Sequence, residues 1–259
     1  MATEPHPVLP SYYRRDDERQ SFVTTLFDTA ARHYDRVCAL GSLGSGRWHR
    51  ENVLRRAGLR AGMRLLDVAT GTGLVARSAM PMVAGPADVI GLDPSAGMLR
   101  EARKTLMSPL VQGRAEALPF AADRFDMLTM GYALRHVTDL EVTFGECLRV
   151  LKPGGRLLIL EVSRPRSRLG RQLLRLYIQR IVPAITHLTT GSGEAALLVR
   201  YYWDTIAECV PPETIVDVLE RSGFVEVGRH VAAGMVTEYL ATKPLESPRR
   251  PANLRAPRA

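Results

Sequence analysis

The chain has 259 residues, of which 46% are hydrophobic and 24% charged, a balance typical of one large soluble α/β domain. Its three cysteines (Cys38, Cys147 and Cys209) are scattered and form no CxxC pair, which indicates a reducing compartment and argues against a structural zinc site. No stretch approaches the roughly 18 consecutive apolar residues of a membrane span, and the first residues lack the apolar core of a signal peptide. We therefore expect a cytoplasmic protein.

The net charge of +8 is concentrated in two segments. Residues 164–180 contain six arginines and no acidic residue, and residues 244–259 contain four arginines and one glutamate. The rest of the chain is close to neutral. This distribution predicts a local basic patch that faces an anionic surface rather than a basic fold.

Residues 1–20 open the chain with prolines and a run of mixed charge, and we expect a flexible N-terminus there. Apolar residues at helical spacing then predict a helix over residues 22–37 and a shorter one over residues 47–57. Both helices precede the strand around which the rest of the chain is organised.

That strand ends in a carboxylate, and two glycines follow it, one residue apart. The run reads Leu65-Leu66-Asp67-Val68-Ala69-Thr70-Gly71-Thr72-Gly73. It predicts a buried strand, a tight turn and a helix N-terminus whose unpaired N–H groups face a ligand. Gly71, Gly73 and Ala76 also satisfy the dinucleotide fingerprint. However, Asp67 would repel a pyrophosphate and suits a ligand with positive charge, such as S-adenosylmethionine.

A second acid lies at the end of the next apolar run, where residues 89–93 finish in Asp93, 20 residues after Gly73. This is the position of a ribose-binding carboxylate in a βαβ unit of this kind. Two plain alternatives remain: Asp67 caps a helix, and Asp93 is a turn residue before Pro94.

Strands and helices continue to alternate after this unit. We expect helices at 74–82, 95–106, 141–151 and 212–222, and strands near 111 and at 125–131, 156–162, 225–231 and 236–242. Residues 164–208 break the alternation and predict a largely helical insertion. The last two strands predict a hairpin that closes one edge of the sheet.

The alternation predicts an α/β, Rossmann-like fold: a seven-stranded, mostly parallel sheet with one antiparallel strand and helices on both faces. We expect a single domain over residues 21–243. Residues 244–259 are expected to form a disordered basic tail.

From about residue 27 to residue 243, the chain resembles the ubiquinone/menaquinone biosynthesis C-methyltransferases, a family of class I S-adenosylmethionine-dependent methyltransferases. The matching landmarks are Phe27-Asp28, Tyr34-Asp35, Arg47-Trp48, the glycine turn, and residues 115–120, 134–139 and 150–156. The stretch over 134–139 is the most specific to the family. The resemblance implies the class I methyltransferase fold, an insertion over residues 164–208 that covers the substrate, and transfer of a methyl group from S-adenosylmethionine to a ring carbon of a prenylated quinol precursor. Methyl transfer of this kind requires no metal.

The resemblance also implies which residues form the cofactor site. It places cofactor contacts at Thr72, Asp93, Arg114, Ala115 and Gly131, and it gives Asp67, Gly71 and Gly73 the role of shaping the pocket. The family usually has an amide residue in place of Arg114 and a small hydroxyl residue in place of Gly131. Contacts through the backbone are still expected at both positions.

Three residues are candidates for the chemistry. Arg135 follows the fourth strand at the edge of the sheet where ligands bind, and it would stabilise a phenolate or hold a water. The alternative is a surface salt bridge with Asp139. His136, which replaces the family's usual Asn, is a candidate base or a satisfied loop histidine. Tyr34 lines the acceptor pocket or is a core aromatic.

The basic insertion carries an apolar stripe formed by Leu169, Leu173, Tyr177 and Ile181, and arginines flank it. This pattern indicates either an amphipathic helix at the inner face of an anionic membrane or an ordinary packed helix. The expected partner is a small-molecule or lipid quinol, and a homodimer is left open. We expect no nucleic-acid partner, because basic and aromatic residues do not interleave.

Rival functions share the same cofactor. The first is a C- or O-methyltransferase of another small phenolic, lipid or secondary-metabolite substrate. A non-catalytic scaffold of the same fold is the second, but the intact glycines, Asp67 and Asp93 argue against it. The basic composition suggests a third, an RNA methyltransferase.

Overall fold

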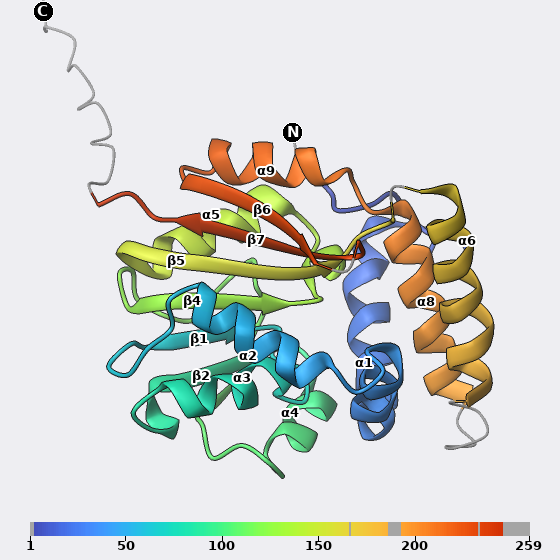
Figure 1. The fold of residues 1–259 in the computed structure, drawn as a ribbon, viewed down its shortest axis with the longest axis horizontal. Coiled ribbons are helices and arrows are strands. Elements are labelled where there is room, and N and C mark those ends of the chain that lie inside the picture. Colours follow the sequence, from blue (N-terminus) through green and yellow to red (C-terminus); the bar gives the residue numbers. More distant parts are fainter. Residues whose placement is uncertain (1–2, 166, 186–192, 233, 246–259) are drawn as a thin grey trace, which may run out of the picture.

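The structure is a computed structural model that describes residues 3–165, 167–185, 193–232 and 234–245. A seven-stranded sheet forms its centre (Figure 1). The strands are β1 (Leu65–Val68), β2 (Val89–Asp93), β3 (Leu110–Gln112), β4 (Phe125–Gly131), β5 (Leu151–Val162), β6 (Val225–Ala232) and β7 (Val236–Thr242). Their spatial order is β3-β2-β1-β4-β5-β7-β6. Strand β7 is antiparallel to β5 and β6, and the other neighbours are parallel, which confirms the predicted fold class.

Helices connect the strands and flank them. They are α1 (Asp16–Gly41), α2 (Gly46–Arg56), α3 (Leu74–Ala79), α4 (Ala96–Ala102), α5 (Leu140–Val150), α6 (Arg168–Leu176), α8 (Gly193–Glu208) and α9 (Pro212–Arg221). Short 3-10 turns cover Met80–Met82, Pro86–Asp88 and Leu134–His136, and a π-helical turn covers Tyr177–Ile181. In the described part of the chain, no helix is long and apolar enough to cross a bilayer.

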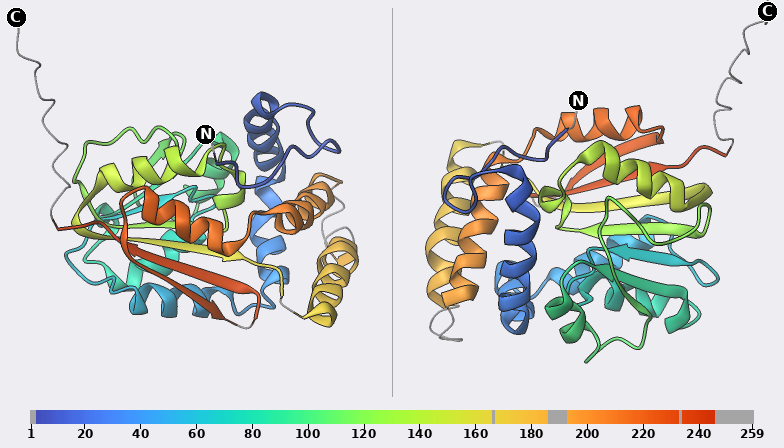
Figure 2. Two further views of the ribbon diagram at one scale, coloured as in Figure 1. Left: turned by 90° about the horizontal axis from the view of Figure 1, so that it is seen from above. Right: turned by 180° about the vertical axis from the view of Figure 1, so that it is seen from behind.

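The sheet is buried on both faces because successive side chains of a strand point in opposite directions. Leu66 and Leu128 pack with α5 and α9 in one core, whereas their neighbours Leu65 and Met127 pack with α2, α3 and α4 in the other. Figure 2 shows α5 and α9 together on one side of the sheet and α2 on the opposite side. The continuous apolar runs of β1 and β4 follow from this two-sided burial.

A third group of helices stands at the end of the sheet, where α1 packs against both α4 and α8 (Figure 1). Helix α6 lies on the outer side of α8 (Figure 2). The insertion predicted over 164–208 is helical in its described residues. Its helix α8 adds Leu198 and Tyr201 to a cluster that includes Leu26 of α1. This group therefore faces the end of the sheet where the carboxyl ends of the parallel strands lie.

Two expectations differ from the structure. The start of the chain is packed: Leu9 and Tyr13 are buried, and the carbonyl of Thr3 accepts a hydrogen bond from the N–H of Leu140. Composition could not show these few anchoring side chains. Strand β5 begins at Leu151, earlier than the predicted residue 156, because the Lys-Pro-Gly-Gly turn continues directly into the sheet. Most of the predicted basic tail lies outside the described residues.

Candidate active site

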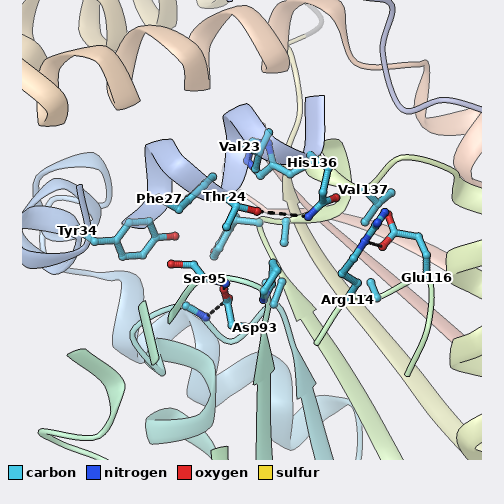
Figure 3. A pocket seen from close by; sticks show the side chains of 18 residues that line it. Val23, Thr24, Phe27, Tyr34, Asp93, Ser95, Arg114, Glu116, His136 and Val137 are labelled. Atoms are coloured by element: carbon cyan, nitrogen blue, oxygen red, sulfur yellow. Dashed lines mark hydrogen bonds and ion pairs between the residues drawn. The ribbon is translucent and has the colours of Figure 1, made fainter. Parts of the chain in front are cut away.

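A pocket lies at the carboxyl ends of β1, β2 and β4, beneath α1 (Figure 3). The sheet side of the pocket includes Gly71, Asp93, Ser95, Arg114, Ala115, Gly131, Tyr132 and His136. Helix α1 contributes Gln20, Val23, Thr24, Phe27 and Tyr34. The edge of the sheet predicted to bind ligands therefore carries the pocket, and a helix from the start of the chain covers it.

Asp93 is held rigidly at the wall of this pocket. One carboxylate oxygen accepts the N–H of Gly71 and the other accepts the N–H of Ser95, each at 2.8 Å. Burial raises the pKa of Asp93 to about 6, and the nearby carboxylates of Asp67 and Asp28 act in the same direction, whereas the two N–H donors lower it. Because each oxygen keeps a free lone pair, this carboxylate can still accept hydroxyl donors from a ligand.

Asp67 lies beneath the pocket rather than in its wall. Its two oxygens accept the hydroxyls of Thr70, at 2.6 Å, and Thr129, at 2.7 Å. Burial also raises the pKa of Asp67 to about 6. Asp67 therefore fixes the turn between β1 and α3, and its charge acts on the pocket from below.

The two glycines of the turn are needed for different reasons. Gly71 has φ +58° and lines the pocket, and a Cβ there would meet only Tyr34 Cε1, at 3.9 Å. Gly73 has φ +85°, and its Cβ would collide with the side chain of Leu106. Thr72, between them, is buried and donates its hydroxyl to Asp35. Its predicted cofactor contact stays a prediction, and its side chain is already engaged.

The other predicted cofactor residues lie together at the far wall. Arg114 lines the pocket and pairs with Glu116, with 3.4 Å between Nε and Oε2. Glu116 is fixed in turn by the N–H and the hydroxyl of Thr138. Ala115 and Gly131 also line the pocket, and a Cβ on Gly131 would lie 2.6 Å from Val75 Cγ2. The packing of α3 thus explains why no side chain stands at position 131.

His136 sits in an aromatic environment where the turn after β4 meets α1 and α8. Its ring centroid lies 5.2 Å from that of Phe27, 5.4 Å from that of Tyr201 and 6.1 Å from that of Tyr202. Burial and the positive charge of Arg135 hold the pKa of His136 well below 6.5, so the imidazole is neutral. Neither ring nitrogen has a hydrogen-bond partner within the described residues. Both nitrogens are buried, and the neutral ring keeps one acceptor nitrogen that no protein group within the described residues uses.

Arg135 is buried behind the pocket and does not line it. It forms a very close ion pair with Glu161 of β5, and its Nε donates to Thr205 Oγ1 of α8 at 3.1 Å. The alternative of a surface pair with Asp139 is wrong, because Asp139 caps α5 by accepting the N–H groups of residues 141 and 142. The expected action of Arg135 on the acceptor stays a prediction.

Tyr34 lines the pocket from α1, as expected for an acceptor-pocket residue. Burial raises the pKa of its hydroxyl well above 10, so the hydroxyl stays protonated. Sequence reasoning missed Gln20, Val23 and Thr24, which line the same wall, and it missed Glu161. Helical periodicity identifies α1 as a helix but does not show what it covers. In the described part of the chain, no group of three or more side chains could hold a metal ion.

Comparisons with known proteins find a family model that covers most of the chain. Residues 14–243 match the model of the ubiE/COQ5 methyltransferase family. A demethylmenaquinone methyltransferase of Symbiobacterium thermophilum is 36% identical over 88% of this chain and 94% of its own. A ubiquinone/menaquinone biosynthesis C-methyltransferase of Stutzerimonas stutzeri is 33% identical over 88% of this chain and 91% of its own.

Solved structures share the fold. A SAM-dependent methyltransferase of Thermotoga maritima has a TM-score of 0.61 at 22% identity, covering 85% of this chain and 99% of that one. A phosphoethanolamine N-methyltransferase of Haemonchus contortus, solved with S-adenosyl-L-methionine, has a TM-score of 0.55 at 18% identity. The match covers 76% of this chain and 52% of that one.

Proposed function

The chain belongs to the ubiE/COQ5 methyltransferase family, and we propose that this S-adenosylmethionine-dependent methyltransferase methylates a ring carbon of a prenylated benzoquinol or naphthoquinol. Relatives that share about a third of its sequence over most of its length are named for menaquinone and ubiquinone biosynthesis. One structural observation supports the acceptor. The pocket joins a carboxylate wall at Asp93 to an aromatic wall that holds a neutral, unpartnered imidazole at His136.

The carboxylate wall suits the cofactor. A buried carboxylate is costly unless a charged or hydrogen-bonding partner meets it, and the raised pKa of Asp93 reflects that cost. S-adenosylmethionine offers both partners, since it has two ribose hydroxyls and two positive charges. We assign the ribose to Asp93 and the methionine part to the turn at Gly71. The adenine is assigned to the backbone of Arg114, Ala115 and Gly131.

The cofactor supplies an activated methyl group on its sulfonium, so the protein mainly has to align the acceptor and exclude water. His136 accepts the hydrogen bond of a ring hydroxyl and takes its proton, which makes the neighbouring ring carbon nucleophilic. Phe27 and Tyr34 hold the faces of the ring. Arg135 positions His136 through its pair with Glu161. Its positive charge lowers the pKa of the imidazole, which keeps the ring neutral before the reaction but also weakens it as a base.

The experiment that tests this proposal is methyl transfer to reduced acceptors of short prenyl-chain length. The protein is incubated without oxygen with S-adenosylmethionine labelled at the methyl group, and the product is analysed by mass spectrometry and NMR. We expect the label on a ring carbon. Label on oxygen would favour the rival O-methyltransferase of a small phenol, and transfer to RNA instead of the quinol would overturn the proposal. Cofactor binding without transfer to any quinol would also overturn it.

The protein is further proposed to contact an anionic membrane through the outer face of α6 and the turn that follows it. Leu169 and Leu173 are 65% and 57% exposed, whereas Leu174 faces the core. All charged residues of the segment 164–180 are arginines. An apolar groove continues this surface, lined by Leu40, Leu43, Tyr177, Ile181, Val182 and Ile185. Such a surface suits the interface of an anionic bilayer, where a prenylated quinol resides.

Vesicle sedimentation tests the membrane contact. The protein should bind vesicles that contain phosphatidylglycerol more strongly than neutral vesicles at low salt, and Leu169→Glu with Leu173→Glu should abolish this preference. Met107→Glu, at an exposed apolar residue elsewhere, is the matched control. Equal binding to both vesicle types would refute the contact. A dimer that the double variant disrupts would show that a second copy covers this face.

A further inference from the structure

Two of the aspartates of helix α1, Asp28 and Asp35, lie seven residues apart, and each reaches a different turn of the cofactor pocket. Seven residues are close to two helical turns, so both side chains lie on one face of the helix. The same helix forms a wall of the pocket through Thr24, Phe27 and Tyr34 (Figure 3). The two aspartates thus fasten the helix that covers the pocket to the turns beneath it.

Asp28 is fastened to the turn that follows β2. One of its oxygens accepts the hydroxyl of Ser95, at 2.5 Å, and the N–H of Gly97, at 2.7 Å. Ser95 also donates its N–H to Asp93 and accepts the N–H of Met98 at the start of α4. Asp28 therefore holds the same residue that orients the predicted ribose carboxylate.

The approach of α1 at this point is close enough to exclude a side chain. A Cβ on Gly97 would lie 2.7 Å from the carbonyl oxygen of Asp28 and 2.8 Å from its Cα. Both atoms belong to the backbone of α1, which cannot move aside without lifting the helix. This contact is independent of the hydrogen bonds and fixes α1 against the pocket.

Asp35 fastens the other end of the covering segment to the glycine turn. One oxygen of Asp35 accepts a hydrogen bond from the hydroxyl of Thr72. The other accepts a hydrogen bond from Nη2 of Arg77 in α3, at 2.7 Å. Thr72 stands between Gly71 and Gly73, so this bond ties α1 directly to the turn that faces the cofactor. Both aspartates bind the protein, and neither lines the pocket.

We propose that Asp28 and Asp35 are positioning residues that hold α1 over the cofactor, as a latch would. They thereby set the rates at which the cofactor enters and leaves the pocket. The proposal rests on the assigned cofactor site. A ligand between α1 and the two turns can exchange only when the helix lifts, and lifting breaks the bonds at Ser95, Gly97 and Thr72. A residue that contacts the ligand slows its release alone, whereas a latch slows both entry and release.

The test measures association and dissociation rate constants of S-adenosylhomocysteine by rapid mixing, without any acceptor. Asp28→Ala should raise both constants by roughly tenfold, as expected from the loss of hydrogen bonds to a charged group. The dissociation constant should change much less. Asp28→Asn should raise both constants less than Asp28→Ala does, because an amide oxygen can accept the same two bonds but lacks the charge. Asp17→Ala, on the same helix but exposed, is the matched control.

Thr72→Val provides an independent variant, because it removes the donor to Asp35 and keeps the shape of the side chain. It should also raise both rate constants. An increase of the dissociation rate alone, or no change in both variants at an unchanged melting temperature, would overturn the proposal. Since no acceptor is present, the result does not depend on which quinol is methylated.

Discussion

The cofactor side and the acceptor side of the pocket are built in contrasting ways. The turns at Gly71, Asp93 and Ala115 follow neighbouring strands within one continuous stretch, and backbone N–H groups fix the carboxylate between them. The acceptor side instead combines α1, the turn at His136 and, through Tyr202, helix α8. Local motifs thus form the wall that we propose for the methyl donor, whereas tertiary packing of distant segments forms the wall that we propose for the acceptor.

The two sides also treat charge in opposite ways. Burial on the cofactor side raises the pKa of Asp67 and Asp93, which suits a ligand that brings positive charge. On the acceptor side, burial and Arg135 keep His136 neutral, which suits an uncharged ring. Variants on the cofactor side should therefore change cofactor affinity, whereas variants on the acceptor side should change turnover.

The largest effect is expected at the buried pair behind the acceptor side. Arg135→Met leaves the Glu161 carboxylate buried without its partner and should lower the free energy of unfolding by about 3–5 kcal/mol. The double variant with Glu161→Leu removes both charges and should recover most of the loss. Denaturant unfolding measures both effects. Arg221→Met, at the exposed pair with Glu141, should cost less than about 1 kcal/mol.

The same double variant tests the role of Arg135. We expect turnover to return together with stability, because the two apolar side chains would pack in place of the ion pair and keep the turn at His136 in position. A stable double variant with intact cofactor affinity and low turnover would instead assign Arg135 the stabilisation of the phenolate.

The next effect concerns His136 and turnover. His136→Asn removes the proton acceptor and should lower kcat by roughly 10²-fold, the lower end of what general-base catalysis contributes. Cofactor affinity should not change, because the imidazole lies on the acceptor side. Steady-state kinetics and calorimetry measure the two quantities. A mild effect on kcat would show that His136 is a loop residue that Asn replaces freely.

On the cofactor side, Asp93→Ala should weaken binding of S-adenosylmethionine by about 1.5–3 kcal/mol, the value of hydrogen bonds to a charged group. Titration calorimetry on the folded variant measures the affinity, and Asp217→Ala on α9, which is exposed, is the control. Unchanged affinity would remove Asp93 from the site.

The smallest effect is a pH dependence of cofactor affinity. The pKa of Asp93 is about 6 in the folded protein, and a cationic ligand favours the ionised form. Affinity should therefore be full above pH 6 and fall by at most tenfold per pH unit below it. Asp93→Asn should flatten this profile, and a wild-type profile without a change near pH 6 would contradict the assignment.

The stability of the ligand-free protein should respond in the opposite direction. Because the folded pKa of Asp93 lies above that of the unfolded chain, its contribution to stability is present at low pH and is lost as the pH rises through about 6. The difference between the wild type and Asp93→Asn in denaturant unfolding isolates this contribution.

Much of the fold and of the cofactor side could be predicted, because strand patterns and turn residues act locally. The expected strand over 125–131 is confirmed, and Ser95 at the start of the helix expected from residue 95 caps α4. The partner of Arg135 could not be predicted, since Glu161 is buried only after β5 pairs with β4. The spacing of Asp28 and Asp35 in the sequence places them on one face of a helix. Only the packing of α1 in the structure shows which turns they contact.

The glycines around the pocket differ in how freely they can change during evolution. A side chain at position 131 would meet only the side chain of Val75, so a smaller residue at 75 could accompany Ser or Ala at 131. These two positions should covary among relatives. A side chain at position 97 would meet the backbone of α1, which no substitution at position 28 can remove. Gly97 should therefore persist even where its neighbours have diverged.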